Sequence, residues 1–245
     1  MRETFFVAAF DAVYPAGTLL ADHFFPPPHL RIRLDSSRFA NLCFDKPFIC
    51  RIIFQFVSMP HISLEAHLPG ITGLLEYRPD TAAPIRELTQ LLLRGPSTLS
   101  EGERELIAAL VSSRNQCTFC TTAHTAAANL LLGEAETCER VKQDFESAPV
   151  SEKLKALLAI AALVQQSGKN VTVEAIERAK QAAATDREIH DTVLIAALFC
   201  LYNKYVDGLA SITPTDPAFY AGLGERIVHH GYTRLPGGYE HLKNK

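Results

Sequence analysis

The sequence predicts an all-α fold of about seven or eight helices. Apolar residues recur at helical spacing through most of the chain after Met59, and capping residues and glycines mark where these segments begin and end. No segment after Met59 has the alternating pattern of a convincing strand. Because the loops between the expected helices are short, neighbouring helices should pack antiparallel, as in a helical bundle.

Local signals place the helices along the chain. Residues 59–80 are rich in proline and glycine and are expected to be irregular. Ser100 with Glu103, and Thr185 with Glu188, form capping boxes that each open a helix. The expected helices cover approximately residues 80–94, 100–111, 117–132, 134–145, 151–167, 172–184, 185–207 and 216–231.

Residues 1–58 differ from the rest of the chain. They contain 10 of the 14 phenylalanines, a triple proline and no long helical period. We expect them to be a poorly ordered or non-native N-terminal extension. One domain should then occupy residues 59–245, with Met59 as its natural start.

The overall composition excludes several classes of protein. The 47% apolar content supports a sizeable core, and a net charge of −3 provides no basic field for nucleic acid. No run of about 18 or more uncharged apolar residues indicates a membrane span. The six cysteines of this 245-residue chain include a single closely spaced pair, which favours redox or metal chemistry over a disulfide framework. We therefore expect a cytoplasmic protein that binds neither nucleic acid nor membrane.

The reactive side chains gather in residues 100–132, where Glu105, Cys117, Cys120 and His124 occur. On a helix that begins near Cys117, positions i, i+3 and i+7 share one face, so both sulfurs and the imidazole can lie together. The positive end of the helix dipole favours a thiolate, which is the reactive form of cysteine. A histidine one turn away can take the proton or pair with the anion.

Glu105 is the candidate carboxylate that orients His124 or relays protons to it. It lies on the preceding helix and reaches the site only if a turn over residues 113–116 folds the two helices together. Phe119, between the two cysteines, either shields the thiols from water or lines an apolar entrance.

Three other interpretations of these residues remain open. The C-x-x-C pair could be half of a zinc site, although no second pair of ligands follows at a suitable spacing. Both cysteines could be inert core thiols, because free cysteine is commonly buried. Glu105 could be a solvated helix residue.

The four residues form the pattern E-x11-C-x2-C-x3-H. This pattern resembles the signature of the alkylhydroperoxidase D-like (AhpD-like) group within the carboxymuconolactone decarboxylase superfamily. Residues 59–108 and 199–232 resemble the opening and closing segments of its uncharacterised peroxidase-related branch, so the resemblance covers about residues 59–240. It implies an all-α AhpD-like bundle that assembles as a homo-oligomer.

The resemblance also implies a thiol-dependent peroxidase of antioxidant defence that reduces organic hydroperoxides. In the family, the second cysteine of the pair is peroxidatic and the first resolves the sulfenic acid as a disulfide. An external dithiol then resets the pair, and the family suggests a lipoyl-bearing protein as its source. No haem, flavin or metal cofactor is expected.

The assignment of roles involves a conflict. The helix dipole alone favours Cys117 as the thiol of lower pKa, whereas proximity to His124 and the family resemblance favour Cys120. We assign Cys120 as peroxidatic, Cys117 as resolving, and His124 with Glu105 as the proton relay. The better-studied peroxidases of the family carry a histidine where this chain has Phe119, a departure that weakens the relay.

Other functions compete with peroxide reduction. The same thiols could serve a disulfide reductase or a redox sensor without peroxide specificity. The chain could also be a non-catalytic helical oligomer or binding module. Lactone decarboxylation, the other activity of the superfamily, is a weaker alternative because it does not need a C-x-x-C pair.

The long helix near the C-terminus carries further polar residues. Asn203, Tyr205 and Asp207 match the closing segment of the family, and we expect structural or interface roles for them. His190, one turn from the helix cap, should make a structural hydrogen bond.

Overall fold

The computed structural model describes residues 59–239 of the 245-residue chain. The expected N-terminal extension, residues 1–58, and the last six residues lie outside the described part. Within it the chain forms nine α-helices and one short 3-10 helix, and no strand. The helices are α4 (Ile71–Tyr77), α5 (Pro79–Arg94), α6 (Glu101–Arg114), α7 (Thr118–Leu132), α8 (Glu136–Asp144), α9 (Glu152–Gln166), η1 (Gly168–Asn170), α10 (Val173–Gln181), α11 (Asp186–Gly208) and α12 (Pro217–His230).

The all-α prediction is confirmed for this part of the chain, but the number of helices was predicted too low. The additional helix is α4, which lies in the region 59–80 that was expected to be irregular. It is only seven residues long and has no side-chain cap, so no local signal marks its start. Leu74 and Leu75 are buried where α4 packs against α5 and α11, which indicates that tertiary packing stabilises it.

The other helices begin and end close to the predicted positions. Both capping boxes form: Glu103 accepts a 2.8 Å hydrogen bond from the Ser100 amide, and Glu188 accepts one of 2.7 Å from the Thr185 amide. Gly133 ends α7 in the left-handed region, with φ of 74°. Local sequence therefore determines most of the helix boundaries.

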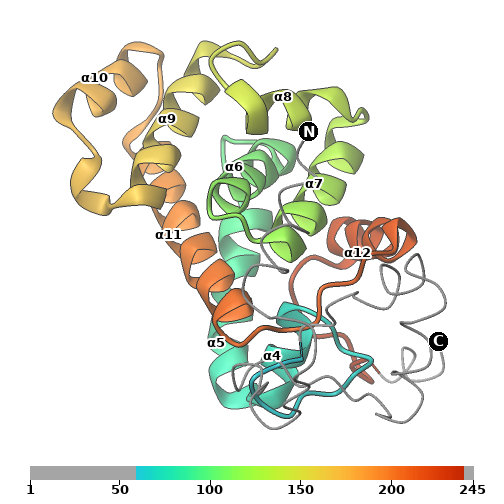
Figure 1. Ribbon diagram of the computed structural model, residues 1–245. Helices are drawn as coiled ribbons and strands as arrows, with labels where there is room; N and C mark the ends of the chain where they lie inside the picture. Colours follow the sequence, from blue (N-terminus) through green and yellow to red (C-terminus); the bar gives the residue numbers. More distant parts are fainter. Residues whose placement is uncertain (1–58, 240–245) are drawn as a thin grey trace, which may run out of the picture. The chain divides into compact units, whose positions relative to one another are not determined.

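Helix α6 is the centre of the fold (Figure 1). Every residue from 104 to 112 is buried, because α6 packs against α7, α8, α9 and α11. Helix α12 covers another side of α7, and a Cβ on Gly224 would lie only 2.9 Å from Cβ of Ala126. Small side chains thus allow α12 to approach the helix that carries the cysteines.

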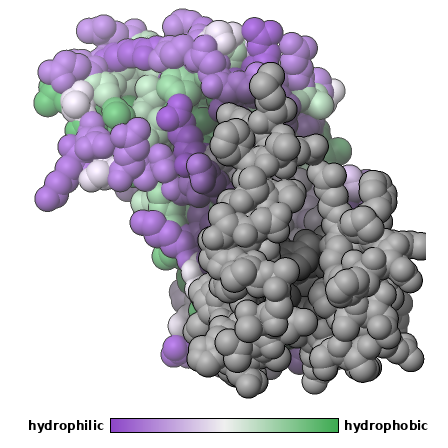
Figure 2. All heavy atoms as spheres, in the orientation of Figure 1, coloured by the Kyte–Doolittle hydropathy of each residue, from purple (hydrophilic) through white to green (hydrophobic). Residues whose placement is uncertain are grey.

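The surface gives no sign of a membrane-spanning element in the described part. No helix between residues 59 and 239 combines the length and the apolar character that crossing a bilayer requires. The visible face over α9 and α10 is largely hydrophilic (Figure 2).

Glu188 connects the start of α11 to two neighbouring segments. Its carboxylate accepts hydrogen bonds from Thr98 Oγ1 at 2.8 Å and Lys153 Nζ at 2.7 Å, in addition to the capping bond. Burial raises the pKa of Glu188, but the hydrogen bonds from Lys153, Thr185 and Thr98 outweigh it and lower the pKa to about 2.

We predict that Glu188→Gln lowers the free energy of unfolding at pH 7 by about 3 kcal/mol. Because the folded pKa lies below the unfolded value, the carboxylate's contribution is complete above the unfolded pKa. It is lost as the pH falls from about 5 towards 2. Urea denaturation of the wild type and variant at several pH values measures this. The exposed Glu177→Gln is the control, and an equal deficit for Glu188→Gln at pH 7 and pH 2 would contradict the assignment.

Candidate active site

A tight turn between α6 and α7 assembles the site. The Cys117 amide donates to the Ser112 carbonyl at 3.1 Å, and the Gln116 amide donates to the Ser113 carbonyl at 3.0 Å. These two bonds form a Schellman motif, with Gln116 in the left-handed region at φ of 60°. The turn folds the two helices together, as the site requires.

Glu105 and His124 meet across the two helices. The Glu105 Oε2 atom lies 2.7 Å from His124 Nδ1, and Glu105 is completely buried. A neutral imidazole that donates from Nδ1 to a carboxylate has its lone pair on Nε2. The contact therefore leaves Nε2 of His124 available to accept a proton.

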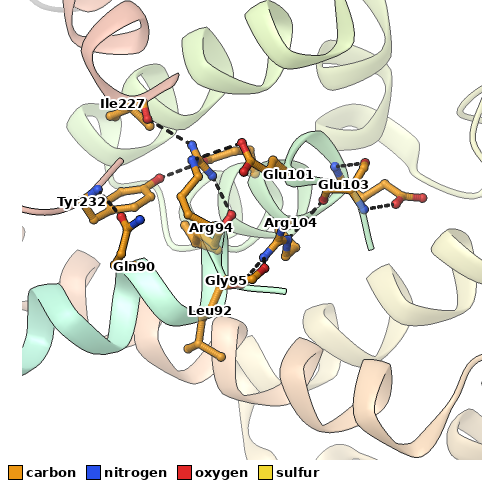
Figure 3. A network of polar contacts seen from close by, with 12 residues as sticks. Gln90, Leu92, Arg94, Gly95, Glu101, Glu103, Arg104, Ile227 and Tyr232 are labelled. Carbon is orange, nitrogen blue, oxygen red and sulfur yellow. Dashed lines mark hydrogen bonds and ion pairs between the residues drawn. The ribbon is translucent and has the colours of Figure 1, made fainter. Parts of the chain in front are cut away.

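Two residues that the sequence analysis did not identify complete this network. Arg94, at the end of α5, donates from Nη2 to Glu105 Oε1 at 2.6 Å, and the Tyr232 hydroxyl donates to the same oxygen at 2.5 Å. Figure 3 shows Arg94 beside Tyr232 and directed towards the Ile227 carbonyl of α12. Arg94 and Tyr232 lie 11 and 127 residues from Glu105, so no helical spacing could have indicated these contacts.

The network keeps the buried carboxylate ionised. Burial raises the pKa of Glu105, but the interaction with His124, the Arg94 guanidinium and the Tyr232 hydroxyl together lower it below its usual range. The pKa of Tyr232 is raised well above its usual range by burial and by the adjacent Glu105 charge. Tyr232 consequently remains a hydrogen-bond donor to the carboxylate at neutral pH.

The segment that carries Tyr232 is itself fixed by α5. The Tyr232 amide donates to Gln90 Oε1 at 2.8 Å (Figure 3). Gly231 ends α12 at φ of 63°, and a Cβ there would lie 2.3 Å from the same Gln90 oxygen. Only glycine avoids both the strained backbone and this clash, so Gly231 allows Tyr232 to reach Glu105.

The two cysteines lie at the start of α7, in different environments. Cys117 is the N-cap residue and is fully enclosed, whereas Cys120 lies in the first turn with 3% of its surface exposed. Hydrogen bonding to Cys117 and burial raise the pKa of the Cys120 thiol well above its usual range. Cys120 thus holds its proton at rest and needs a base to become a thiolate.

Asn203 and Asp207 of α11 lie against the two thiols. A hydrogen bond from Asn203 acts on Cys120, and Cys117 hydrogen bonds to Asp207, whose pKa is raised by burial. Asn203 is positioned by Asn115 at 2.8 Å and by Ser112 at 3.1 Å. The sequence analysis expected structural or interface roles for Asn203 and Asp207, but their position beside the sulfurs makes them part of the candidate site.

A small cavity opens onto Cys120 and His124. Its volume is about 60 Å³, and Cys120 and His124 line it while Cys117 does not. Phe119 forms part of its wall and is almost completely buried. The Phe119 ring packs on Gly70, where a Cβ would lie 2.2 Å from a ring carbon, so the ring has little room to move. Phe119 thus lines the cavity and is held there by its contact with Gly70.

The described residues do not support the zinc interpretation. No group of three or more histidine, cysteine, aspartate or glutamate side chains among residues 59–239 has the arrangement of a metal site. His124 is engaged by a carboxylate on Nδ1, and the thiols of Cys117 and Cys120 interact with each other.

Comparisons with known proteins agree with this fold. Residues 79–137 match the model of the Carboxymuconolactone decarboxylase family. The structure resembles an uncharacterized peroxidase-related protein with an alkylhydroperoxidase AhpD core from Ralstonia eutropha JMP134. The TM-score is 0.57 and the identity 21%, over 82% of this chain and 95% of that one. No curated protein matches the sequence.

Two further solved structures have the same architecture. An uncharacterized peroxidase-related protein from Silicibacter sp. TM1040 gives a TM-score of 0.57 at 21% identity, over 80% of this chain and 96% of that one. The second is a protein of unknown function from Agrobacterium tumefaciens, described as "Putative Antioxidant Defence Protein AhpD". Its TM-score is 0.52 and its identity to this chain is 21%. That match covers 58% of this chain and 97% of the other. At this identity the likeness establishes the fold.

We predict that Glu105→Gln destabilises the protein by about 3 kcal/mol at pH 7, because it removes the short ion pair of the buried Arg94 and leaves only the longer contact with Glu101, at 3.5 Å. The folded pKa of Glu105 is lowered, so its contribution is present above the unfolded pKa and is lost as the pH falls through the folded pKa. The deficit should therefore shrink in acid.

Urea denaturation at several pH values measures this deficit. Tyr232→Phe removes one neutral donor from the same carboxylate and should cost only about 1 kcal/mol. If both variants lost the same small amount at pH 7, the carboxylate would not carry the charge that we assign to it.

Proposed function

We propose that the chain is a thiol-dependent peroxidase, because residues 79–137 match the Carboxymuconolactone decarboxylase family model and the fold resembles that of a protein with an AhpD core. Its substrates are organic hydroperoxides, and its role is antioxidant defence. One observation carries the proposal: Cys120 and His124 line the same cavity, and the buried Glu105 holds His124 by Nδ1. A thiol and a base thus face one space in which a small peroxide can react.

In the first step, Nε2 of His124 accepts the proton of the Cys120 thiol. The thiolate attacks the distal oxygen of the hydroperoxide and the O–O bond breaks. The alkoxide leaves with a proton from His124 as the alcohol, and Cys120 becomes a sulfenic acid. The raised pKa of Cys120 explains why a base is needed, and Glu105 stabilises the imidazolium that forms between the two transfers.

In the second step, the Cys117 sulfur attacks the sulfenic sulfur of Cys120. The hydroxyl group leaves as water, taking the Cys117 proton, and a disulfide forms. Asp207, which hydrogen bonds to Cys117, can relay that proton to the leaving hydroxyl. An external dithiol, such as a lipoyl group on another protein, then reduces the disulfide by two electrons through a mixed disulfide and is itself oxidised.

Thiol–disulfide exchange without peroxide specificity is the second candidate. The raised pKa of Cys120 favours it, because a mostly protonated thiol reacts slowly with peroxide unless the base is effective. The small cavity favours the peroxidase, since a hydroperoxide fits it more readily than a protein disulfide. A non-catalytic oligomer would leave the polar network behind the cavity without a role.

We place the protein in the cytoplasm, where the thiol pair can be kept reduced between turnovers. The four cysteines among residues 59–239 are free thiols, which is the form that the first step needs. We also propose that the chain forms a homo-oligomer, as its resemblance to the AhpD-like group implies.

We predict that the wild type consumes tert-butyl hydroperoxide with dihydrolipoamide as reductant. Cys120→Ser should abolish turnover, because it removes the attacking sulfur. Cys117→Ser should allow one reaction per subunit and then stop, because the sulfenic acid cannot be resolved. Peroxide consumption and dihydrolipoamide oxidation measure both effects.

Cys138→Ala is the matched control, since Cys138 is a buried thiol that does not line the cavity. It should retain full turnover. No turnover by the wild type, with both thiols reacting freely with a disulfide reagent, would favour exchange or sensing over peroxide reduction.

A further inference from the structure

One wall of the cavity carries positive charge that the proposed chemistry does not use. Arg86 of α5 and Arg226 of α12 line the cavity together with Cys120 and His124. Both guanidinium groups donate to the hydroxyl of Tyr239, at 3.2 Å from Arg86 Nη1 and 3.1 Å from Arg226 Nη2. Residues from three separate segments thus converge on one hydroxyl at the cavity wall.

The hydroxyl proton of Tyr239 is available for a further hydrogen bond. Its oxygen accepts from both arginines, and no acceptor for its own proton occurs among residues 59–239. A phenol whose oxygen accepts two bonds from cations directs its proton towards a further acceptor. Tyr239 lines both this cavity and a larger groove beside it, so such an acceptor can come from a bound ligand.

The charges at this wall are unbalanced. Arg86 pairs with Glu76 at 3.0 Å, but Arg234 pairs with the same carboxylate at 2.8 Å. Arg226 forms no ion pair within the described part of the chain. Arg86 and Arg234 therefore share one carboxylate while Arg226 has none, and the Nε atoms of Arg86 and Arg226 are buried without a partner. For the buried Arg86, which shares its carboxylate, the remaining charge is costly unless an anion compensates it.

Two simpler roles do not account for Arg86 and Arg226 at this wall. Activation of the thiol is one, yet the groups that shift the pKa of Cys120 most are Cys117, Asn203 and Asp207 rather than an arginine. Anchoring of Tyr239 is the other, but one arginine would be enough for it. Arg86 is only 8% exposed, and holding an ill-compensated charge there suggests a ligand.

The size of the cavity limits where an anion can sit relative to the peroxide. A volume of about 60 Å³ holds about four to six water-sized groups. Beyond it lies an outer groove of about 660 Å³, which shares Arg226 and Tyr239 with the cavity. Phe219 and Leu235 contribute apolar surface to this groove. A molecule with its peroxide at Cys120 would place atoms a few bonds away beside the arginines.

We propose that Arg86, Arg226 and Tyr239 bind a carboxylate of the substrate, so that the preferred hydroperoxides are short hydroperoxy acids. This inference rests on the proposed peroxidase function and adds the substrate class. The carboxylate accepts from the two guanidinium groups and from the Tyr239 hydroxyl, while the hydroperoxide group reaches Cys120. An additional apolar chain extends past Arg226 into the outer groove.

The test compares two hydroperoxides that differ in charge and by a single methyl group. One is 4-hydroperoxy-4-methylpentanoate, which is tert-butyl hydroperoxide with one methyl group extended by –CH₂COO⁻. The other is the methyl ester of this acid. The wild type should use the acid with a kcat/KM about tenfold or more above that of the ester, the size expected for a charge-assisted contact. In Arg226→Gln the ratio of acid to ester should fall to about one.

Arg140→Gln is the control, because Arg140 is an exposed arginine of α8 that does not line the cavity. It should keep the wild-type ratio. A wild-type ratio near one, or an equal loss of preference in Arg226→Gln and Arg140→Gln, would overturn the proposal.

A binding measurement separates this inference from the proposed function. Titration by saturation-transfer NMR should show that pentanoate binds the wild type about tenfold more tightly than the isosteric neutral pentanamide. Arg226→Gln should remove the difference. Preferential binding without any peroxide turnover would retain the anion site and overturn the peroxidase. Equal binding of the two ligands would overturn the anion site, whatever the turnover.

Discussion

The site depends on the burial of one ionised carboxylate. Glu105 lies on the central helix α6, where water cannot compensate its charge, so every partner must come from the protein. Arg94 arrives from α5, His124 from α7 and Tyr232 from the segment after α12. Four separate parts of the chain are thereby held at one point. The orientation of His124, and with it the base that Cys120 needs, is a consequence of that arrangement.

The two thiols differ in their access to the cavity and in their environment. Cys120 reaches the cavity but keeps its proton, while Cys117 is enclosed and hydrogen bonds to Asp207. In the proposed mechanism, peroxide therefore meets only the sulfur that requires a base. In the same proposal, the histidine held by an ionised carboxylate supplies that base without a second histidine between the cysteines. The position that such a histidine would occupy holds Phe119, which forms part of the cavity wall instead.

Sequence reasoning was most successful where a local signal exists. The capping boxes at Ser100 and Thr185 marked helix starts because their hydrogen bonds span only three residues. The pairing of Glu105 with His124 was anticipated because a single turn connects their helices. Contacts such as that of Tyr232 with Glu105 join distant segments and leave no periodic pattern. Helix α4 was missed for a related reason, since packing rather than capping stabilises it.

The attack of Cys120 on peroxide is the central claim, and trapping the sulfenic acid tests it most directly. Cys117→Ser protein would be treated with one equivalent of tert-butyl hydroperoxide in the presence of dimedone, and the labelled residue would be located by mass spectrometry. We expect label on Cys120, formed more slowly when His124 is also replaced by glutamine. Label on Cys117 in the matched Cys120→Ser protein, with none on Cys120 in Cys117→Ser, would contradict the assignment and reverse the roles of the two thiols.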